Sequence, residues 1–207
     1  IYYSFEIENG RIKEINVNPT DGIHNLSMNI FVVERELLIQ LVKNAYDHGL
    51  THFTRDILWV KRNELKLHAY EYEGYIAHIC SINSYFDENM KLLKDENLDA
   101  LFGPAPIFTK IRDDNPTRYT DDANVKNTMI ADGCFIEGEV ENSILFRGVK
   151  VAKGAKVKNC ILMQDTVIEA GAEIEYLITD KEVTVSANVE MKGTESYPTY
   201  IVKGYTV

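Results

Sequence analysis

The stretch Val151-Ala-Lys-Gly-Ala-Lys-Val157 decides the fold, because its pattern returns along the last third of the chain. Each copy has an apolar residue, two further residues, Gly or Asn, a small or apolar residue, any residue and a second apolar residue. The other copies are residues 130–136, 168–174 and 185–191. The last three copies begin 17 residues apart, whereas the first begins 21 residues before the second. Such a unit is about three hexapeptides, which predicts one coil of a triangular parallel β-helix.

A second repeated run of residues supports this prediction. The run Val140-Glu-Asn-Ser-Ile-Leu145 returns 17 residues later as Val157-Lys-Asn-Cys-Ile-Leu162. In a β-helix each inward apolar side chain stacks on its equivalent in the next coil, so stability is a sum over neighbouring coils. We expect small residues at the tight inner corners (Cys134, Ala155, Ala172) and turn residues that tolerate positive φ (Gly133, Gly154, Gly171, Asn188). A β-sandwich is the alternative, but it does not predict the same seven-residue pattern four times.

Composition limits the classes of partner. Among 207 residues there are 22 Lys and Arg against 32 Asp and Glu, a formal charge of −10, which argues against a nucleic-acid-binding surface. This charge balance does not exclude an anionic ligand that binds at a local cluster of cations. No apolar run approaches the roughly 18 residues of a membrane span. Three cysteines without CxxC spacing indicate reduced, buried thiols in a cytoplasmic protein. No signal peptide is recognisable, and the strand-like opening without an initiator Met suggests a fragment of a larger fold.

The first part of the chain predicts a mixed α/β structure. Asn9-Gly10 between two alternating runs, residues 2–8 and 11–17, is typical of a type I′ hairpin. Apolar spacing predicts helices over residues 34–48, closed by Gly49, and over residues 81–93, with Ser81 as N-cap. We also expect a buried strand at 28–33 and an alternating strand at 65–72. Residues 95–122 contain repeated Gly, Pro and Asn breaks and predict an extended connector between two domains.

The chemistry-bearing residues are sparse. The five histidines (His24, His48, His52, His68, His78) all precede the repeats, so the coils offer no acyl-transfer base and no zinc site. A hexapeptide-repeat acyltransferase is therefore disfavoured, and a structural or regulatory role of the coils is favoured. No glycine-rich phosphate loop occurs. Five cations could meet a phosphate but are expected to be solvated (Arg112, Arg118, Arg147, Lys192, Lys203).

Several motifs together resemble the C-terminal part of bacterial glucose-1-phosphate adenylyltransferase. Ser27-Met-Asn-Ile-Phe-Val-Val is similar to the family's Ser-Met-Gly-Ile-Tyr-Val-Phe strand. Tyr70-Glu-Tyr-Glu-Gly-Tyr and Ser84-Tyr-Phe-Asp-Glu-Asn-Met resemble the strand and helix beside its sugar-phosphate site. Asp180-Lys-Glu-Val resembles part of its β-helix.

The resemblance implies the domain organisation. Residues 1–94 would be the C-terminal part of a Rossmann-like nucleotidyltransferase domain, 95–122 the connector, and 123–207 a left-handed parallel β-helix of hexapeptide repeats. The left hand comes from the resemblance alone, since the general crossover rule favours the right hand. The family's ATP-binding loop lies upstream of this stretch, so these residues alone would not form an adenylyltransferase site, and no cofactor is expected within them.

The departures from the family pattern concern its sugar-phosphate and metal positions. Catalytic members have Glu-Lys-Pro where this chain has Val17-Asn18-Pro19, and the neutral Asn cannot offset phosphate charge as Lys does. A metal-binding Asp corresponds to His78, and a neutral imidazole is a poor ligand for the Mg²⁺ that catalytic subunits use. Asn29 replaces a family Gly, whereas Ser27 keeps a sugar-facing position. No catalytic residue and no metal ligand is therefore expected in this chain.

These departures are typical of the regulatory, GlgD-type subunits of the family. The resemblance implies a non-catalytic subunit that assembles with a catalytic adenylyltransferase subunit, as a hetero-oligomer and by family pattern a tetramer, in bacterial glycogen synthesis. A phosphate or sugar-phosphate effector is implied, without its residues. The alternatives are an active sugar-1-phosphate nucleotidyltransferase with altered substrate preference, and a scaffold without effector binding. Neither nucleic acid nor a membrane is an expected partner.

Overall fold

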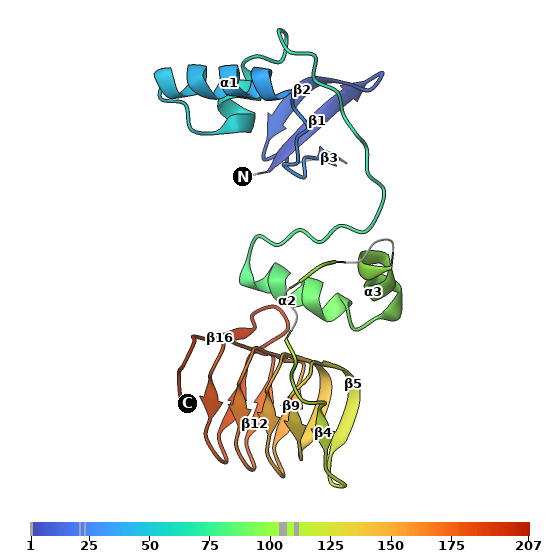
Figure 1. Cartoon of the computed structure of the whole chain (residues 1–207), viewed down its shortest axis with the longest axis vertical. Coiled ribbons are helices and arrows are strands. Elements are labelled where there is room, and N and C mark those ends of the chain that lie inside the picture. The colour runs from blue at the N-terminus through green and yellow to red at the C-terminus, as the bar shows by residue number, and fades with distance from the viewer. Residues whose placement is uncertain (1, 21, 23, 104–106, 110–111) are drawn as a thin grey trace. The chain divides into compact units, whose positions relative to one another are not determined.

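A computed structural model describes the chain except for residues 1, 21, 23, 104–106 and 110–111. It divides into two compact units, Ile1–Glu73 and Gly74–Val207 (Figure 1). The boundaries predicted after residues 94 and 122 do not coincide with this division. No helix in the described part of the chain is long and apolar enough to cross a lipid bilayer.

The first unit is built on a three-stranded antiparallel sheet. β1 (Tyr3–Glu8) pairs with β2 (Arg11–Val17) on one side and with β3 (Asn25–Leu26) on the other. Asn9 and Gly10 both have positive φ, 52° and 73°, as a type I′ turn requires. The predicted hairpin is therefore confirmed.

An α-helix and a short π-helix also belong to this unit. The predicted helix is confirmed as α1 (Arg35–Asp47), followed by Gly49 at φ 66°. Its buried Leu41 and Ala45 pack against Ile57 of the π-helix η1 (Phe53–Trp59).

Two predicted strands of the first unit are wrong. Residues 28–33 have no strand partner in the described structure, and most of their side chains are exposed, Ile30 to 75 %. Residues 65–72 contribute one bridge, between His68 and Arg11. Apolar alternation supplies a strand's side-chain pattern, but a strand also needs a hydrogen-bonded neighbour along its length.

Two helices precede the solenoid in the second unit. α2 (Ile82–Lys91) confirms the predicted helix, and Ser81 and Ser84 form a reciprocal capping box at its start. α3 (Asp95–Phe102) falls where an extended connector was expected, so that prediction is wrong for these residues. Asp95 and Glu96 in its first turn suit the positive end of the helix dipole. The parts of the predicted connector at 104–106 and 110–111 lie outside the described residues.

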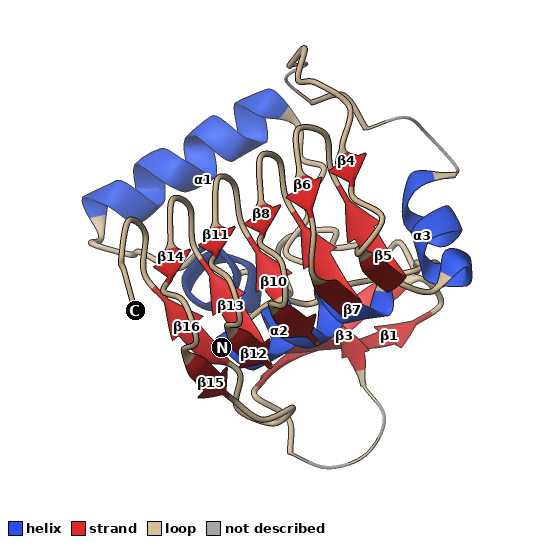
Figure 2. Cartoon of the chain, turned by 90° about the horizontal axis from the view of Figure 1, so that it is seen from below, coloured by secondary structure: helices blue, strands red, loops and turns tan. Residues whose placement is uncertain are grey.

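The rest of the second unit is a parallel β-solenoid with three faces, which confirms the predicted β-helix (Figures 1 and 2). The first face is the five-stranded sheet of β4 (Arg118–Tyr119), β6 (Phe135–Ile136), β8 (Lys150–Val151), β11 (Val167–Ile168) and β14 (Thr184–Val185). The eight-stranded sheet bends into the other two faces. β5 (Asn124–Ile130) and β7 (Glu139–Leu145) cross the bend and belong to both.

Each half of the bent sheet continues through three short strands. The second face holds β9 (Lys156–Lys158), β12 (Glu173–Glu175) and β15 (Glu190–Lys192). The third face holds β10 (Ile161–Leu162), β13 (Leu177–Thr179) and β16 (Thr199–Ile201).

The interior consists of stacked columns, one from each face. Ile136, Val151, Ile168 and Val185 stack in register on the first face, and all are fully buried. Val140, Val157, Ile174 and Met191 stack on the second, as the 17-residue spacing predicts. The third column is Leu145, Leu162, Thr179 and Ile201. These columns make up most of the largest hydrophobic cluster of the chain.

The sequence pattern predicts that Ile130, the start of the first copy, aligns with Val151, the start of the second. This alignment is wrong by one corner of the coil. Ile136, rather than Ile130, pairs with Val151, whereas Ile130 pairs with Leu145. The true offset from Ile136 to Val151 is 15 residues, because the chain turns the corner between Ile136 and Val140 with fewer residues than the equivalent corner between Val151 and Val157. Cys134 therefore precedes the strand aligned with Lys150 and is the equivalent of Val149, not of Ala155. It is nevertheless buried, as are Ala155 and Ala172.

The predicted turn geometry holds at every quoted position. Gly133, Gly154, Gly171 and Asn188 have φ of 78°, 76°, 72° and 59°. Gly154, Gly171 and Asn188 stack at one corner, and Gly133 stacks with Gly148 at another.

Candidate functional site

The predicted sugar-phosphate position, Asn18, lies directly after β2. Its φ is 48°, and its Oδ1 accepts a hydrogen bond from the backbone N–H of Tyr2 at 2.8 Å. Its own N–H donates to the carbonyl of Tyr2, also at 2.8 Å. Val17 pairs with Tyr3 across the hairpin. Asn18 therefore holds the end of β2 against Tyr2, the residue before β1, and places a neutral amide at this position.

Ser27 and Asn29 lie on the other side of β1. The Ser27 N–H donates to the carbonyl of Tyr3 at 2.8 Å, and its Oγ accepts from the Asn29 N–H at 3.1 Å. Asn29 has a φ of 54°, which a family Gly would adopt without strain. The structure thus brings Asn18 and Ser27 to two consecutive residues, Tyr2 and Tyr3, at the start of β1. The described residues that line the hollow beside them (Tyr2, Pro19, Gly22, His24, Leu26) include no lysine or arginine.

His78 belongs to the second unit, in the exposed extended segment before α2. Within the described parts of the chain, no three His, Cys, Asp or Glu side chains are grouped closely enough to hold a metal ion. An imidazole at this position does not fit Mg²⁺, which prefers carboxylate and water oxygens.

The segment that carries His78 is tied to the solenoid through α2. The Cys80 N–H donates to Ser84 Oγ at 2.9 Å, within the capping box that starts the helix. One turn further on, Phe86 is 3 % exposed and packs against Ile161 and Ile178. The helical pattern of residues 81–93 alone did not predict this contact. Its signal was the paired apolar residues, such as Ile161-Leu162, since two successive apolar residues in a strand bury both of its faces.

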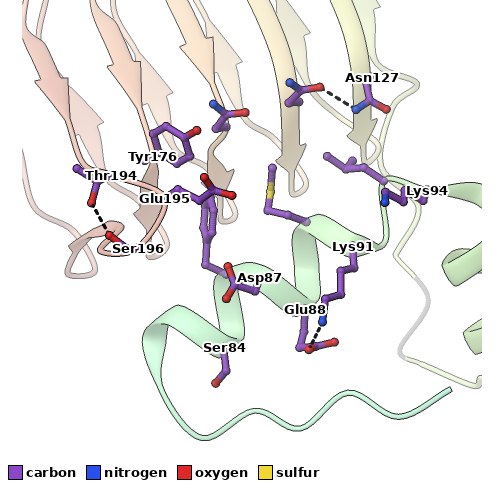
Figure 3. Close-up of a pocket in the computed structure, with 15 residues that line it drawn as sticks. Ser84, Asp87, Glu88, Lys91, Lys94, Asn127, Tyr176, Thr194, Glu195 and Ser196 are labelled. Atoms are coloured by element: carbon purple, nitrogen blue, oxygen red, sulfur yellow. Dashed lines mark hydrogen bonds and ion pairs between the residues drawn. The ribbon is translucent and has the colours of Figure 1, made fainter.

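An open groove of about 930 Å³ runs between α2 and the bend of the eight-stranded sheet (Figure 3). Ser84, Asp87, Lys91 and other α2 residues line one wall. The opposite wall is one corner of the solenoid, formed by residues in successive coils (Asn127, Asn142, Asn159, Tyr176). The loop with Thr194, Glu195 and Ser196 closes one end, where Asn83 Nδ2 donates to the Ser196 carbonyl.

The corner residues of this groove share one backbone conformation. Asn127, Asn142, Asn159 and Tyr176 have φ between 45° and 53°, a region that Asn tolerates best among residues with side chains. Asn127 Nδ2 donates to Asn142 Oδ1 at 2.7 Å, and Asn159 Nδ2 donates to Glu175 Oε1 at 3.4 Å. The sequence signal for this corner is the Asn that the two repeated runs share, at positions 142 and 159.

The lining of the groove has a small excess of carboxylates over lysines. Lys91 pairs with Glu88 at 2.6 Å, and this hydrogen bond raises the pKa of Lys91. The lining also contains two further carboxylates, Asp87 and Glu195, and one further lysine, Lys94. None of the five cations that the sequence offered for a phosphate lines the groove. Four of them lie beside carboxylates (Arg112 and Arg147 near Asp114, Lys192 near Glu190, Lys203 near Glu182), and Arg118 lies over the Phe135 ring.

Comparison with known proteins agrees with the solenoid and its surroundings. Residues 110–196 match a family model described as GlmU-like, C-terminal hexapeptide. The chain is 38 % identical over 149 residues to the glycogen biosynthesis protein GlgD of Bacillus subtilis, covering 71 % of this chain and 43 % of that protein. It is 41 % identical over 132 residues to GlgD of Geobacillus stearothermophilus, covering 63 % of this chain and 38 % of that protein.

Glucose-1-phosphate adenylyltransferases are also similar. The protein of that name from Geobacillus stearothermophilus is 32 % identical over 155 residues, covering 72 % of this chain and 40 % of that protein. The chain thus spans about two fifths of the length of these relatives.

Proposed function

Because the chain belongs to the family of GlgD proteins and glucose-1-phosphate adenylyltransferases, we propose that it is part of a regulatory, non-catalytic subunit. The assembled enzyme would make ADP-glucose and diphosphate from ATP and glucose 1-phosphate in cytoplasmic glycogen biosynthesis. The partner would be a catalytic subunit in a hetero-oligomer, by family pattern a tetramer. A phosphate or sugar phosphate would be the effector.

The observation that carries this proposal is the bonding of Asn18. The position that resembles the phosphate-binding lysine of catalytic members holds an amide whose Oδ1 is occupied by the Tyr2 N–H. An amide provides no positive charge to offset a sugar phosphate. The described residues of the adjoining hollow supply no lysine or arginine in its place.

His78 supports the same proposal independently. A hard divalent cation that bridges phosphate oxygens needs carboxylate ligands, and an imidazole at the metal position lowers its affinity. Asn18 and His78 are thus two unfavourable replacements at positions that belong to one site in the family. Two such replacements favour a loss of catalytic activity, whereas an altered contact with the substrate would need only one.

The packing of α2 suggests how such a subunit could influence its partner. The hydrogen bond from Cys80 to Ser84 and the buried ring of Phe86 join the His78 segment to the third face of the solenoid. A change at the coils would therefore reach this segment through one short, capped helix. The coils themselves offer a rigid surface for subunit contact.

A steady-state assay of the full-length protein, alone and mixed with a catalytic subunit, tests the proposal. We expect no ADP-glucose formation by the protein alone and a change in KM or effector response of the mixture. Robust turnover by the protein alone would overturn the regulatory role. Unchanged kinetics across a phosphate and sugar-bisphosphate titration would favour a scaffold without effector binding.

The double variant Asn18→Lys, His78→Asp separates the regulatory subunit from an enzyme of altered preference. In a regulatory subunit the variant gains activity or stays inactive towards glucose 1-phosphate. An enzyme adapted to another sugar 1-phosphate would lose its own activity, measured with a panel of sugar 1-phosphates and nucleotides.

A further inference from the structure

We propose that the groove between α2 and the asparagine corner of the solenoid binds a neutral oligosaccharide. The groove lies wholly within the second unit, and its lining shares no residue with the Asn18 position or with His78. The inference therefore stands independently of the proposed subunit role.

The first argument is the geometry of the wall. Asn127, Asn142, Asn159 and Tyr176 occupy the same corner in four successive coils. Neighbouring parallel strands lie about 4.8 Å apart, so polar groups recur along this wall at a spacing close to the length of one hexose unit. An open, linear groove with a regular repeat suits a chain of similar units better than one compact small molecule.

The second argument is the chemistry of the lining. Sugar hydroxyls donate and accept hydrogen bonds, and amide groups of asparagine do the same. Asp87 and Glu195 add acceptors, and Ser84, Thr194 and Ser196 add hydroxyls. The ring of Tyr176, half-buried against Phe86 at a centroid distance of 6.1 Å, offers an apolar surface to the C–H groups of a sugar ring.

The third argument is charge. Three carboxylates and two lysines line the groove, and one lysine is already paired with Glu88. A phosphorylated ligand would meet a net negative lining, which disfavours it. A neutral polyol does not pay this electrostatic penalty.

The backbone excludes an added peptide strand at this wall. The corner N–H groups are used between coils, with Asn159 donating to Glu141, Tyr176 to Lys158 and Gly193 to Glu175 at 2.8–3.2 Å. Strand addition needs unpaired N–H and C=O groups along an edge. Recognition at this wall therefore depends on side chains.

Calorimetric titration of the full-length protein with maltoheptaose, and separately with cellohexaose, tests the inference. Binding of either sugar supports a neutral oligosaccharide site, and the stronger of the two identifies the preferred linkage. The absence of binding to both, or tighter binding of glucose 1-phosphate that competes with the sugars, would overturn it.

A matched pair of variants locates the site. Asn142→Gly with Asn159→Gly removes two amides while glycine keeps the positive φ without strain. We expect binding to weaken about tenfold, the effect of losing roughly one net hydrogen bond. Asn188→Gly makes the same change at a corner outside the groove and should leave the affinity within about twofold.

Equal loss in the groove variant and in Asn188→Gly would overturn the assignment of the site. If the double variant has a lowered Tm, Glu195→Gln replaces it, since this side chain lies in an exposed loop. We expect weaker binding in Glu195→Gln at an unchanged Tm. An unchanged affinity in both groove variants would contradict the proposal.

Discussion

Asn188 lies directly over Gly171 in the next coil, so closely that a Cβ added to Gly171 would come 2.5 Å from Asn188 Oδ1. Gly171 also has a φ of 72°, which disfavours any side chain. The glycine at this corner therefore meets two separate requirements: the turn, and the approach of the following coil.

Gly171→Ala is expected to destabilise the solenoid by about 2 kcal/mol, since the positive φ and the contact with Asn188 both oppose the new methyl group. Chemical denaturation followed by circular dichroism measures the free energy of unfolding. Gly204→Ala is the control, because Gly204 has a φ of 70° but no atom within 4 Å of the added Cβ. It should cost only the backbone part, about 1 kcal/mol. Equal costs for the two variants would contradict the role of Asn188.

Phe86→Ala is expected to release α2 from the solenoid. Removing this nearly buried ring from its contacts with Ile161 and Ile178 should cost about 3 kcal/mol. Hydrogen exchange should speed up at the amides of α2 while the coils stay protected. Ile82→Ala on the same helix, where the side chain is 48 % exposed, should have a small effect. Faster exchange throughout the solenoid would show instead that α2 is needed for the coils to fold.

The three thiols should differ in reactivity. Burial raises the pKa of Cys160 to about 12 and also raises the pKa of Cys134, whereas Cys80 is exposed. Because the thiolate is the nucleophile, Cys160 stays protonated and unreactive between about pH 7 and 9, and burial makes Cys134 less acidic and less accessible than an exposed thiol. Alkylation with iodoacetamide followed by mass spectrometry should modify Cys80 alone in the native protein and all three after denaturation. Native labelling of Cys160 would show that the solenoid opens.

Asp56 should make the first unit sensitive to acid. The side-chain hydrogen bond from Arg55, at 2.5 Å, lowers the pKa of Asp56 most, and the His52 and Thr51 N–H groups add to this effect. A lowered folded-state pKa means that the stabilisation is complete above the ordinary carboxyl range and is lost as the pH falls through the folded-state value.

Asp56→Asn should accordingly destabilise the unit near neutral pH, with a difference from the parent chain that shrinks as the pH falls below about 4. Denaturation curves measured across this range provide the test. A constant difference at all pH values would contradict the lowered pKa.

Local signals in the sequence were sufficient for several elements. The type I′ hairpin at Asn9-Gly10 and the capping of α2 by Ser81 depend on residues next to one another, so their structures follow from local chemistry. The same applies to the positive φ at Gly154 and Gly171. The site positions Asn18 and His78 were predicted from resemblance to family motifs rather than from local chemistry.

Elements that depend on a neighbour were less predictable. Residues 28–33 have the composition of a strand but no partner in the described structure. The groove was missed because its walls come from α2 and from four coils that lie 36 or more residues further along the chain. Nothing in the local sequence indicates which helix will cover the outward-facing Ile161 and Ile178.

By itself the sequence determined that the last third is a parallel β-helix, because every coil must repeat the inward apolar positions and the turn residues of the one before. It also showed a neutral Asn18 and a His78 within runs that resemble motifs of the family. Only the tertiary structure decided that Ile136, rather than Ile130, aligns with Val151. The register between coils is set by the hydrogen bonds between their strands. One corner with fewer residues, between Ile136 and Val140, therefore changes which residues pair without changing the repeating pattern. For the same reason, the hydrogen bond between Asn127 and Asn142 and the groove beside α2 exist only once the coils are stacked.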